Sequence, residues 1–125
     1  MSTPYDLLAD RLFEAIGAGD LGTVADCMSA DMTVWTNFDG NTVTRDASLA
    51  TIGWLSRKVV GLRYEVVDRT VIDGGFVQQH VLHGAGPTGI EIAMPACLVV
   101  TVSDDLVTSM REYCDPSAIL SAFPR

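Results

Sequence analysis

Two histidines and one glutamate are the side chains of this sequence best suited to acid–base chemistry. His80 and His83 lie in one strand-like run, and Glu112 lies in a later one. Histidine is the usual general acid or base near neutral pH, and a carboxylate on its far nitrogen fixes its tautomer. Asn37 could hold a substrate carbonyl or a water molecule beside such a pair. We therefore predict His83 and Glu112 as the acid–base pair and Asn37 as an orienting catalytic residue.

Only one of the two histidines can face a given cavity. They are three residues apart, and successive side chains of a strand point to opposite faces of the sheet. Alternation favours His83 as the inward residue, whereas a bulge in the strand would put His80 in its place. A simpler interpretation is also open, in which Glu112 pairs with Arg111 or Arg63 on the outer face and His83 is solvated.

The sequence shows no other motif for catalysis or metal binding. It contains no glycine-rich phosphate loop, no HExxH, no GxSxG and no cluster with metal-ligand spacing. Its cysteines, Cys27, Cys97 and Cys114, form no CxxC pair, which argues against a zinc site and against a redox dithiol. We predict a protein that uses no metal and no cofactor.

Composition narrows the setting in which the protein works. A chain of 125 residues fits a single domain, 1–125, and 16 acidic against 8 basic residues disfavour binding to nucleic acid. The first residues lack the pattern of a secretory signal, and the apolar stretch 92–102 is too short to span a membrane. Scattered free cysteines are typical of a reducing compartment. We expect a cytoplasmic protein with neither nucleic-acid nor membrane partners.

Hydrophobic periodicity predicts three helices followed mainly by strands. The helices are expected to begin near Pro4, Asp20 and Asp46, the first after a capping box formed by Thr3 and Asp6. One strand-like run, 32–36, lies between the second and third helices. Four more follow the third helix, at 62–72, 76–85, 90–102 and 106–113. Pro95 interrupts one of them, and its missing N–H predicts a bulge or an unpaired edge there.

These elements define an α+β fold: three N-terminal helices packed on a curved antiparallel sheet of four to six strands. A strongly twisted sheet needs the helices to cover its concave face. The space left between helices and sheet is then the default site for a ligand.

The chain resembles the nuclear transport factor two-like superfamily, and within it the SnoaL-like and ketosteroid isomerase-like small proteins. The resemblance covers nearly the whole chain and rests on the segments 17–20, 32–38, 87–89, 95–97 and 111–115. It implies a cone-shaped molecule with an internal cavity and a homodimer built on the outer sheet face. The superfamily contains isomerases, cyclases, epoxide hydrolases and non-catalytic binders, so the resemblance alone does not define a reaction.

The motifs of two known members are not preserved. By similarity, Thr36 stands where a ketosteroid isomerase has its base, and Leu12 and Leu98 stand where it has its oxyanion-hole residues. That mechanism is therefore disfavoured.

The epoxide hydrolase relay is also changed. By similarity to limonene epoxide hydrolase, Glu112 and His83 replace its two aspartates, and Val81 replaces its arginine. Asn37 matches its asparagine, with Trp35 at its tyrosine, only after a shift of one residue. Without that shift, Thr36 takes the place of the asparagine.

We therefore predict a small cofactor-free enzyme that binds a hydrophobic molecule, such as a polyketide, terpenoid or steroid, and catalyses proton transfer in isomerisation, cyclisation or water addition. The alternatives are an epoxide hydrolase with a rearranged relay and a non-catalytic ligand-binding protein. The predicted substrate-binding residues are Trp35, Thr36, Leu12, Trp54, Gln79, Val81, Met94, Ala96, Leu98, Met110 and Cys114.

Overall fold

Helices at the start of the chain and strands in its second half dominate the computed structural model, which describes residues 3–124. The helices are α1 (Pro4–Ala18), α2 (Leu21–Asp26), α3 (Arg45–Lys58) and the short α4 (Ser117–Leu120). The strands are β1 (Met28–Thr36), β2 (Thr42–Thr44), β3 (Val60–Ile72), β4 (Gly75–Ala85), β5 (Glu91–Ser103) and β6 (Leu106–Cys114).

The strands form one curved sheet of six, in the order β2-β1-β6-β5-β4-β3. Neighbouring strands are antiparallel except β1 and β6, which run parallel. The expected α+β class is confirmed, and the expectation of a wholly antiparallel sheet is wrong for this one pair. The β3–β6 meander is antiparallel throughout, and its last strand returns beside β1 in the same direction as β1.

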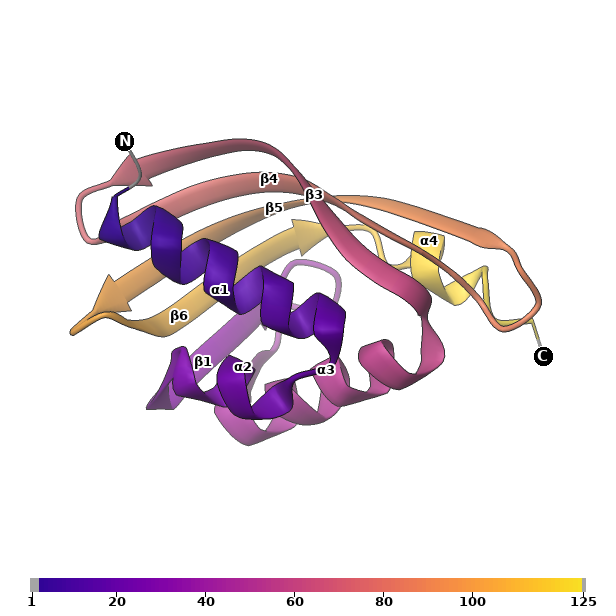
Figure 1. Ribbon diagram of the computed structural model, residues 1–125, viewed down its shortest axis with the longest axis horizontal. Helices are drawn as coiled ribbons and strands as arrows, with labels where there is room; N and C mark the ends of the chain where they lie inside the picture. Colours follow the sequence, from indigo (N-terminus) through magenta and orange to yellow (C-terminus); the bar gives the residue numbers. More distant parts are fainter. Residues whose placement is uncertain (1–2, 125) are drawn as a thin grey trace.

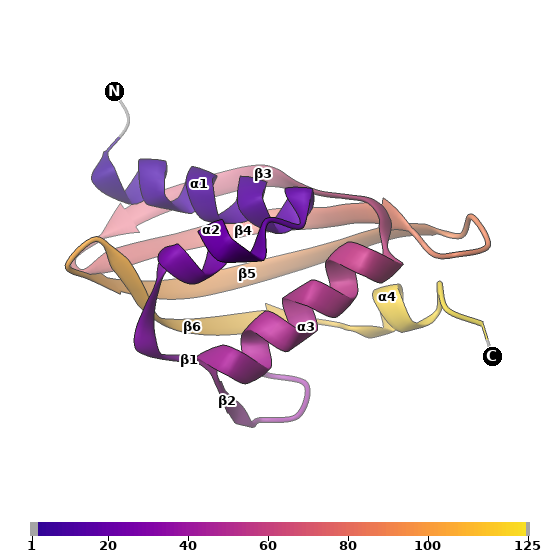
Figure 2. The same ribbon diagram turned by 60° about the horizontal axis from the view of Figure 1, so that its bottom comes forward.

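The first three helices lie on one side of the sheet. Figures 1 and 2 show α1 running along the concave side of β3 and β4, with α3 placed below it towards β1 and β6. Side chains that are fully buried between these layers include Leu12, Phe76, Ile92 and Val100. Two hydrogen bonds fix the start of α1. The Thr3 hydroxyl accepts from the backbone N–H of Asp6, and the Asp6 carboxylate accepts from the backbone N–H of Thr3. The predicted capping box is thus confirmed.

The register of the long hairpin decides which side chains face the helices. β4 and β5 pair without a shift from Gly75 opposite Thr101 to Ala85 opposite Glu91. Even-numbered residues of β4, β5 and the end of β6 therefore share the concave face, as their burial shows.

Pro95 occupies a place where β5 loses a neighbour. The pairing of β5 with β6 begins at Ala96, opposite Cys114, so Pro95 pairs only with β4. The expected unpaired edge is thus confirmed. The bulge of this strand pair lies elsewhere, at Thr101 and Val102.

Candidate active site

A cavity of about 280 Å³ lies between the sheet and helices α1 and α3. Its walls are mostly apolar: Phe13, Ile16, Val34, Ile52, Leu55, Leu98 and Met110. Its mouth lies at the turn after β1, where Phe38 is 55% exposed and Asp39, Asn41 and Val43 also line the opening. Tyr64, His80 and Glu112 supply polar groups, and Ser48 adds a buried hydroxyl.

His80 is the histidine that faces the cavity. It is only 2% exposed, and its ring packs edge-on against Phe13 and Tyr64, with centroid distances of 5.2 and 4.8 Å. Its Nδ1 lies 2.8 Å from Nε2 of Gln78, and its buried Nε2 has no protein partner among the described residues. Burial, with Arg69 nearby, lowers the pKa of His80 to about 4, so the ring is neutral at neutral pH.

Glu112 supplies the carboxylate of the cavity. It lies on β6 opposite Leu98 of β5 and Thr36 of β1. No lysine, arginine or histidine forms an ion pair with it in residues 3–124. Burial raises the pKa of Glu112, and the Glu112 charge in turn helps to raise the pKa of Tyr64. A carboxylate in this state is a stronger base than a solvated one.

The two groups face a shared space without pairing to each other. His80 on β4 and Glu112 on β6 are separated by the strand β5. They are also offset along that strand by two residues, because His80 pairs with Ala96 and Glu112 pairs with Leu98. Ideal strand spacing puts their Cα atoms roughly 12 Å apart. Two inward side chains over that span leave room for a ligand between them.

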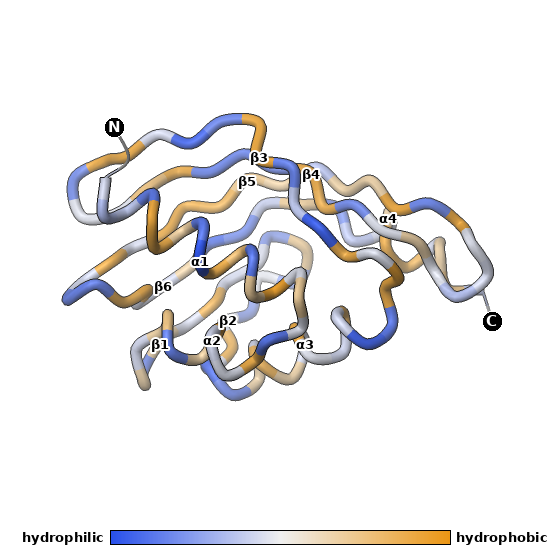
Figure 3. The backbone as a smooth tube through the Cα atoms, viewed as in Figure 1, coloured by the Kyte–Doolittle hydropathy of each residue, from blue (hydrophilic) through white to orange (hydrophobic). Residues whose placement is uncertain are grey.

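The expectation that His83 points into the cavity is wrong. Its Nε2 lies 2.8 Å from Oε1 of Glu65, and neither residue lines the cavity. β4 pairs with β5 without a bulge, and its even-numbered residues, not its odd-numbered ones, face the helices. Gln78, Gln79 and His80 are consecutive polar residues, and Figure 3 shows a hydrophilic stretch along β4. The strand therefore lacks the alternation that would have set its inward face.

The structure also excludes the outer-face interpretation of Glu112. The Arg111 guanidinium lies over the Trp35 ring and donates to the Tyr113 hydroxyl, while Arg63 donates to the backbone carbonyl of Gly61. Glu112 itself lines the cavity.

Asn37 joins two strands and does not line the cavity. Its side-chain oxygen accepts from the backbone N–H of Cys114 at 2.9 Å, and its own backbone N–H donates to the carbonyl of Glu112. This arrangement extends the β1–β6 ladder past the end of β1. It fixes the backbone on the C-terminal side of Glu112, which is a structural contribution to the site.

Replacing Asn37 with alanine should therefore lower stability and leave chemistry almost unchanged. We expect a loss of about 1 kcal/mol in the free energy of unfolding, the usual worth of one hydrogen bond. Urea denaturation of the variant and the wild type measures it. A loss of ligand binding or activity at unchanged stability would contradict this assignment.

The other predicted binding residues divide into three groups. Thr36, Leu98 and Met110 line the cavity, and Cys114 lies beside Glu112, which together with burial raises the pKa of its thiol to about 12. Buried in the apolar core without lining the cavity are Leu12, Met94 and Ala96. The remaining four lie away from the cavity. Trp35 packs against Tyr113 and Trp54 against Phe123, while Gln79 and Val81 are on the outer face of the sheet.

Sequence reasoning missed several residues of the site. Phe13 and Tyr64 enclose the His80 ring, and Gln78 contacts it directly. A signal was available for Gln78, because residues two apart on a strand share a face, so His80 and Gln78 had to point the same way. Phe38 at the mouth gave no such signal, since it lies in an irregular turn.

Comparison with known proteins assigns the family. Residues 9–110 match the SnoaL-like domain, and the chain belongs to this family. The fold is thus that of a SnoaL-like member of the nuclear transport factor two-like superfamily. No curated protein matches the chain.

Solved structures share the fold at low sequence identity. A proposed SnoaL-like polyketide cyclase of Shewanella putrefaciens is 14% identical, with a TM-score of 0.82 over 98% of this chain and 97% of the other. An LEH-like epoxide hydrolase of M. tuberculosis is 14% identical, with a TM-score of 0.78 over 97% and 90%.

A third similar structure contains a small ligand. It is a protein of Catenulispora acidiphila with a ketosteroid isomerase-like fold, in complex with trimethylamine, at 15% identity and a TM-score of 0.80 over 94% and 93% of the two chains. These likenesses show the fold and do not define a substrate.

Two features are absent from the described residues. None of the helices within 3–124 is long and apolar enough to cross a membrane. The same residues contain no group of three or more histidine, cysteine, aspartate or glutamate side chains that could hold a metal ion.

Proposed function

We propose that the protein is a cofactor-free enzyme that moves a proton on a carbon next to a carbonyl group of a largely apolar molecule. One observation carries the proposal: a half-buried carboxylate without a cationic partner, Glu112, and a neutral imidazole with an unpartnered Nε2, His80, line the same apolar cavity. Perturbed titratable groups that converge in one cleft are the usual mark of an active site.

The chemistry follows from the two groups. The Glu112 carboxylate takes the proton from the carbon beside the carbonyl. The electron pair of that C–H bond forms a carbon–carbon double bond, and the π pair of the carbonyl moves onto its oxygen. His80 hydrogen-bonds to this oxygen through Nε2 and stabilises the enolate. The protonated Glu112 then returns the proton to another carbon of an extended enolate, which gives isomerisation. If the enolate carbon instead attacks a second carbonyl of the same molecule, a ring closes and the protonated Glu112 gives its proton to the alkoxide oxygen that forms. His80 therefore replaces His83 in the proposed mechanism.

The cavity favours a compact substrate. Its volume of 280 Å³ lies just below the usual range of ligand pockets, about 300–1,000 Å³. A molecule with one or two rings, of polyketide or terpenoid type, matches this space. A steroid would extend through the mouth, where the exposed Phe38 offers an apolar surface.

The proposal includes a cytoplasmic homodimer. A shallow groove on the outer sheet face, lined by Val67, Val81, Pro95, Cys97 and Tyr113 among others, is largely apolar and supports association through this face. The free cysteines support a reducing compartment.

Deuterium exchange tests the proposed activity without knowledge of the natural substrate. The probe is 1-indanone, a two-ring ketone with exchangeable hydrogens on the carbon beside its carbonyl. In D₂O the protein should accelerate loss of these hydrogens, measured by ¹H NMR, well above the buffer rate. Binding of 1-indanone with exchange at the buffer rate would instead identify a non-catalytic binding protein. Diol formation from indene oxide, with labelled water oxygen in the product, would identify an epoxide hydrolase.

A further inference from the structure

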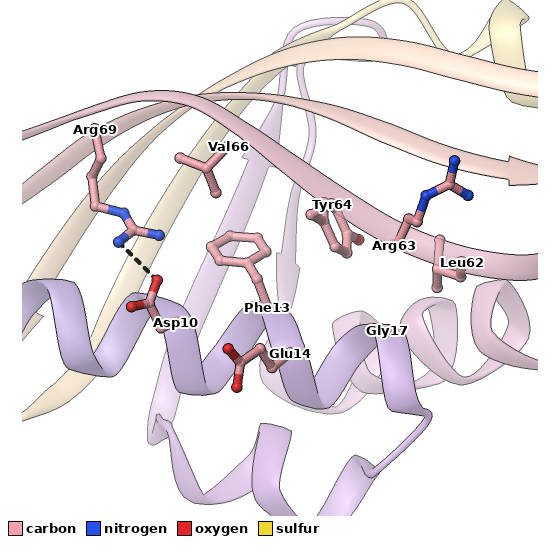
Figure 4. Close-up of a pocket in the computed structure, with 9 residues that line it drawn as sticks. All are labelled: Asp10, Phe13, Glu14, Gly17, Leu62, Arg63, Tyr64, Val66 and Arg69. Carbon is pink, nitrogen blue, oxygen red and sulfur yellow. Dashed lines mark hydrogen bonds and ion pairs between the residues drawn. The ribbon is translucent and has the colours of Figure 1, made fainter.

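A polar network runs from a surface groove to the cavity. The groove, about 340 Å³, lies between α1 and β3, and Figure 4 shows Asp10 on the helix facing Arg69 on the strand. Nη1 of Arg69 lies 3.0 Å from Oδ1 of Asp10, and its Nε lies 2.8 Å from Oε1 of Gln78. Gln78 in turn contacts His80, which lines the cavity.

A bulge in β3 makes this network possible. The pairing of β3 with β4 shifts between Val66, opposite His80, and Asp68, opposite Gln79. Strict alternation from Val66 would point Arg69 to the outer face, and the extra residue reverses that parity. The Arg69 side chain is consequently only 10% exposed, and it contacts Gln78, which is fully buried.

The donor and acceptor groups then determine the orientation of the Gln78 amide and the position of the hydrogen on the His80 ring. Arginine has donors only, so the Gln78 oxygen must face Arg69 and the Gln78 NH₂ group must face His80. Nδ1 of His80 therefore accepts a hydrogen bond. A neutral imidazole carries one hydrogen, and it must lie on the other nitrogen, Nε2.

We infer that Arg69 and Gln78 are positioning residues that hold His80 as a hydrogen-bond donor, so that the cavity selects ligands that place an acceptor oxygen, such as a ketone carbonyl, at Nε2. This deepens the proposed function and rests on it for the identity of the reaction. A hydroxyl or amine hydrogen pointed at Nε2 would meet another donor. A buried N–H without a partner costs about 1–3 kcal/mol, so a carbonyl that satisfies it gains specificity as well as affinity.

The tautomer of His80 can be measured directly in the wild-type protein. Long-range ¹H–¹⁵N NMR distinguishes a ring with hydrogen on Nε2 from one with hydrogen on Nδ1. The chain has two histidines, so His83 on the outer face serves as an internal reference. At mildly alkaline pH we expect the hydrogen of His80 on Nε2. A hydrogen on Nδ1, or an exchanging mixture, would overturn the inference whether or not the protein is an enzyme.

A single substitution should invert the network. Gln78→Glu offers two acceptor oxygens, one for Arg69 and one for His80, so Nδ1 must now carry the hydrogen and Nε2 becomes an acceptor. The matched control is Gln79→Glu, which adds the same charge on the outer face of the same strand. NMR should show the tautomer inverted in the first variant and unchanged in the second.

Ligand binding provides the second measurement. Binding of 1-indanone should weaken about 10-fold or more in Gln78→Glu, the cost of losing one buried hydrogen bond, while binding of indane, which has the same ring system without the carbonyl, stays unchanged. Equal effects on both probes would mean that Gln78 only shapes the cavity, which contradicts the positioning role. If the tautomer is as expected but wild-type protein exchanges no deuterium, the positioning role stands and the proposed enzyme activity fails.

Discussion

Replacing Glu112 with glutamine should lower the protein-catalysed rate of deuterium exchange into 1-indanone about 1,000-fold, the middle of the range for removal of a general base. The amide keeps the shape of the side chain but cannot take a proton from carbon. Binding of 1-indanone should change little, because the carbonyl contact belongs to His80. The effect should therefore appear in kcat and hardly in KM.

The variant should remain folded, which makes the result interpretable. Burial raises the pKa of Glu112, so its charge is unfavourable in the folded state, and a neutral amide removes that cost. The matched control is Glu65→Gln, which removes a carboxylate paired with His83 outside the cavity. A wild-type exchange rate in Glu112→Gln, or an equal loss in both variants, would remove Glu112 from the mechanism.

Acid should destabilise the protein through His80. In the unfolded chain the imidazole has its ordinary pKa of 6.5, whereas in the folded protein burial and the charge of Arg69 lower it to about 4. The unfolded state therefore binds the proton first as pH falls. The contribution of His80 to stability is complete above pH 6.5 and is lost on acidification towards pH 4, by up to about 3 kcal/mol.

The substitution His80→Asn isolates this contribution. Asparagine keeps an acceptor for Gln78 but does not titrate. Urea denaturation of both proteins across the acid range should show the wild type losing about 3 kcal/mol more than the variant. His83→Asn, on the outer face, should keep this loss. Glu112 titrates in the opposite sense, because its raised pKa favours the folded state on acidification, but it is present in all three proteins and cancels in the difference. Parallel curves for wild type and His80→Asn would show that His80 is not buried as a neutral ring.

The fold could be predicted from sequence because its signals are local. The Thr3–Asp6 capping box, the glycine-rich turns and the long apolar runs each specify one element, and their order leaves few ways to cover the sheet. The parallel pairing of β1 with β6 was missed because it joins segments far apart in the chain. No local pattern records it.

The site was predicted only in part for a similar reason. Glu112 lies in a strand whose parity was inferred correctly, while the inward face of β4 depends on the register of its hairpin with β5. A hairpin register that differs by one residue exchanges His80 for His83. The alternation of side chains could not predict that Arg69 points inward, because the β3 bulge that turns it inward has no clear sequence signal.

The crystal structure of the wild-type protein with 1-indanone would test the central claim most directly. It should show the ketone in the cavity between the helices and the sheet, its carbonyl oxygen hydrogen-bonded to Nε2 of His80 and the adjacent carbon against the Glu112 carboxylate. A ketone bound only in the outer groove, or bound in the cavity with its carbonyl turned to the mouth, would contradict it.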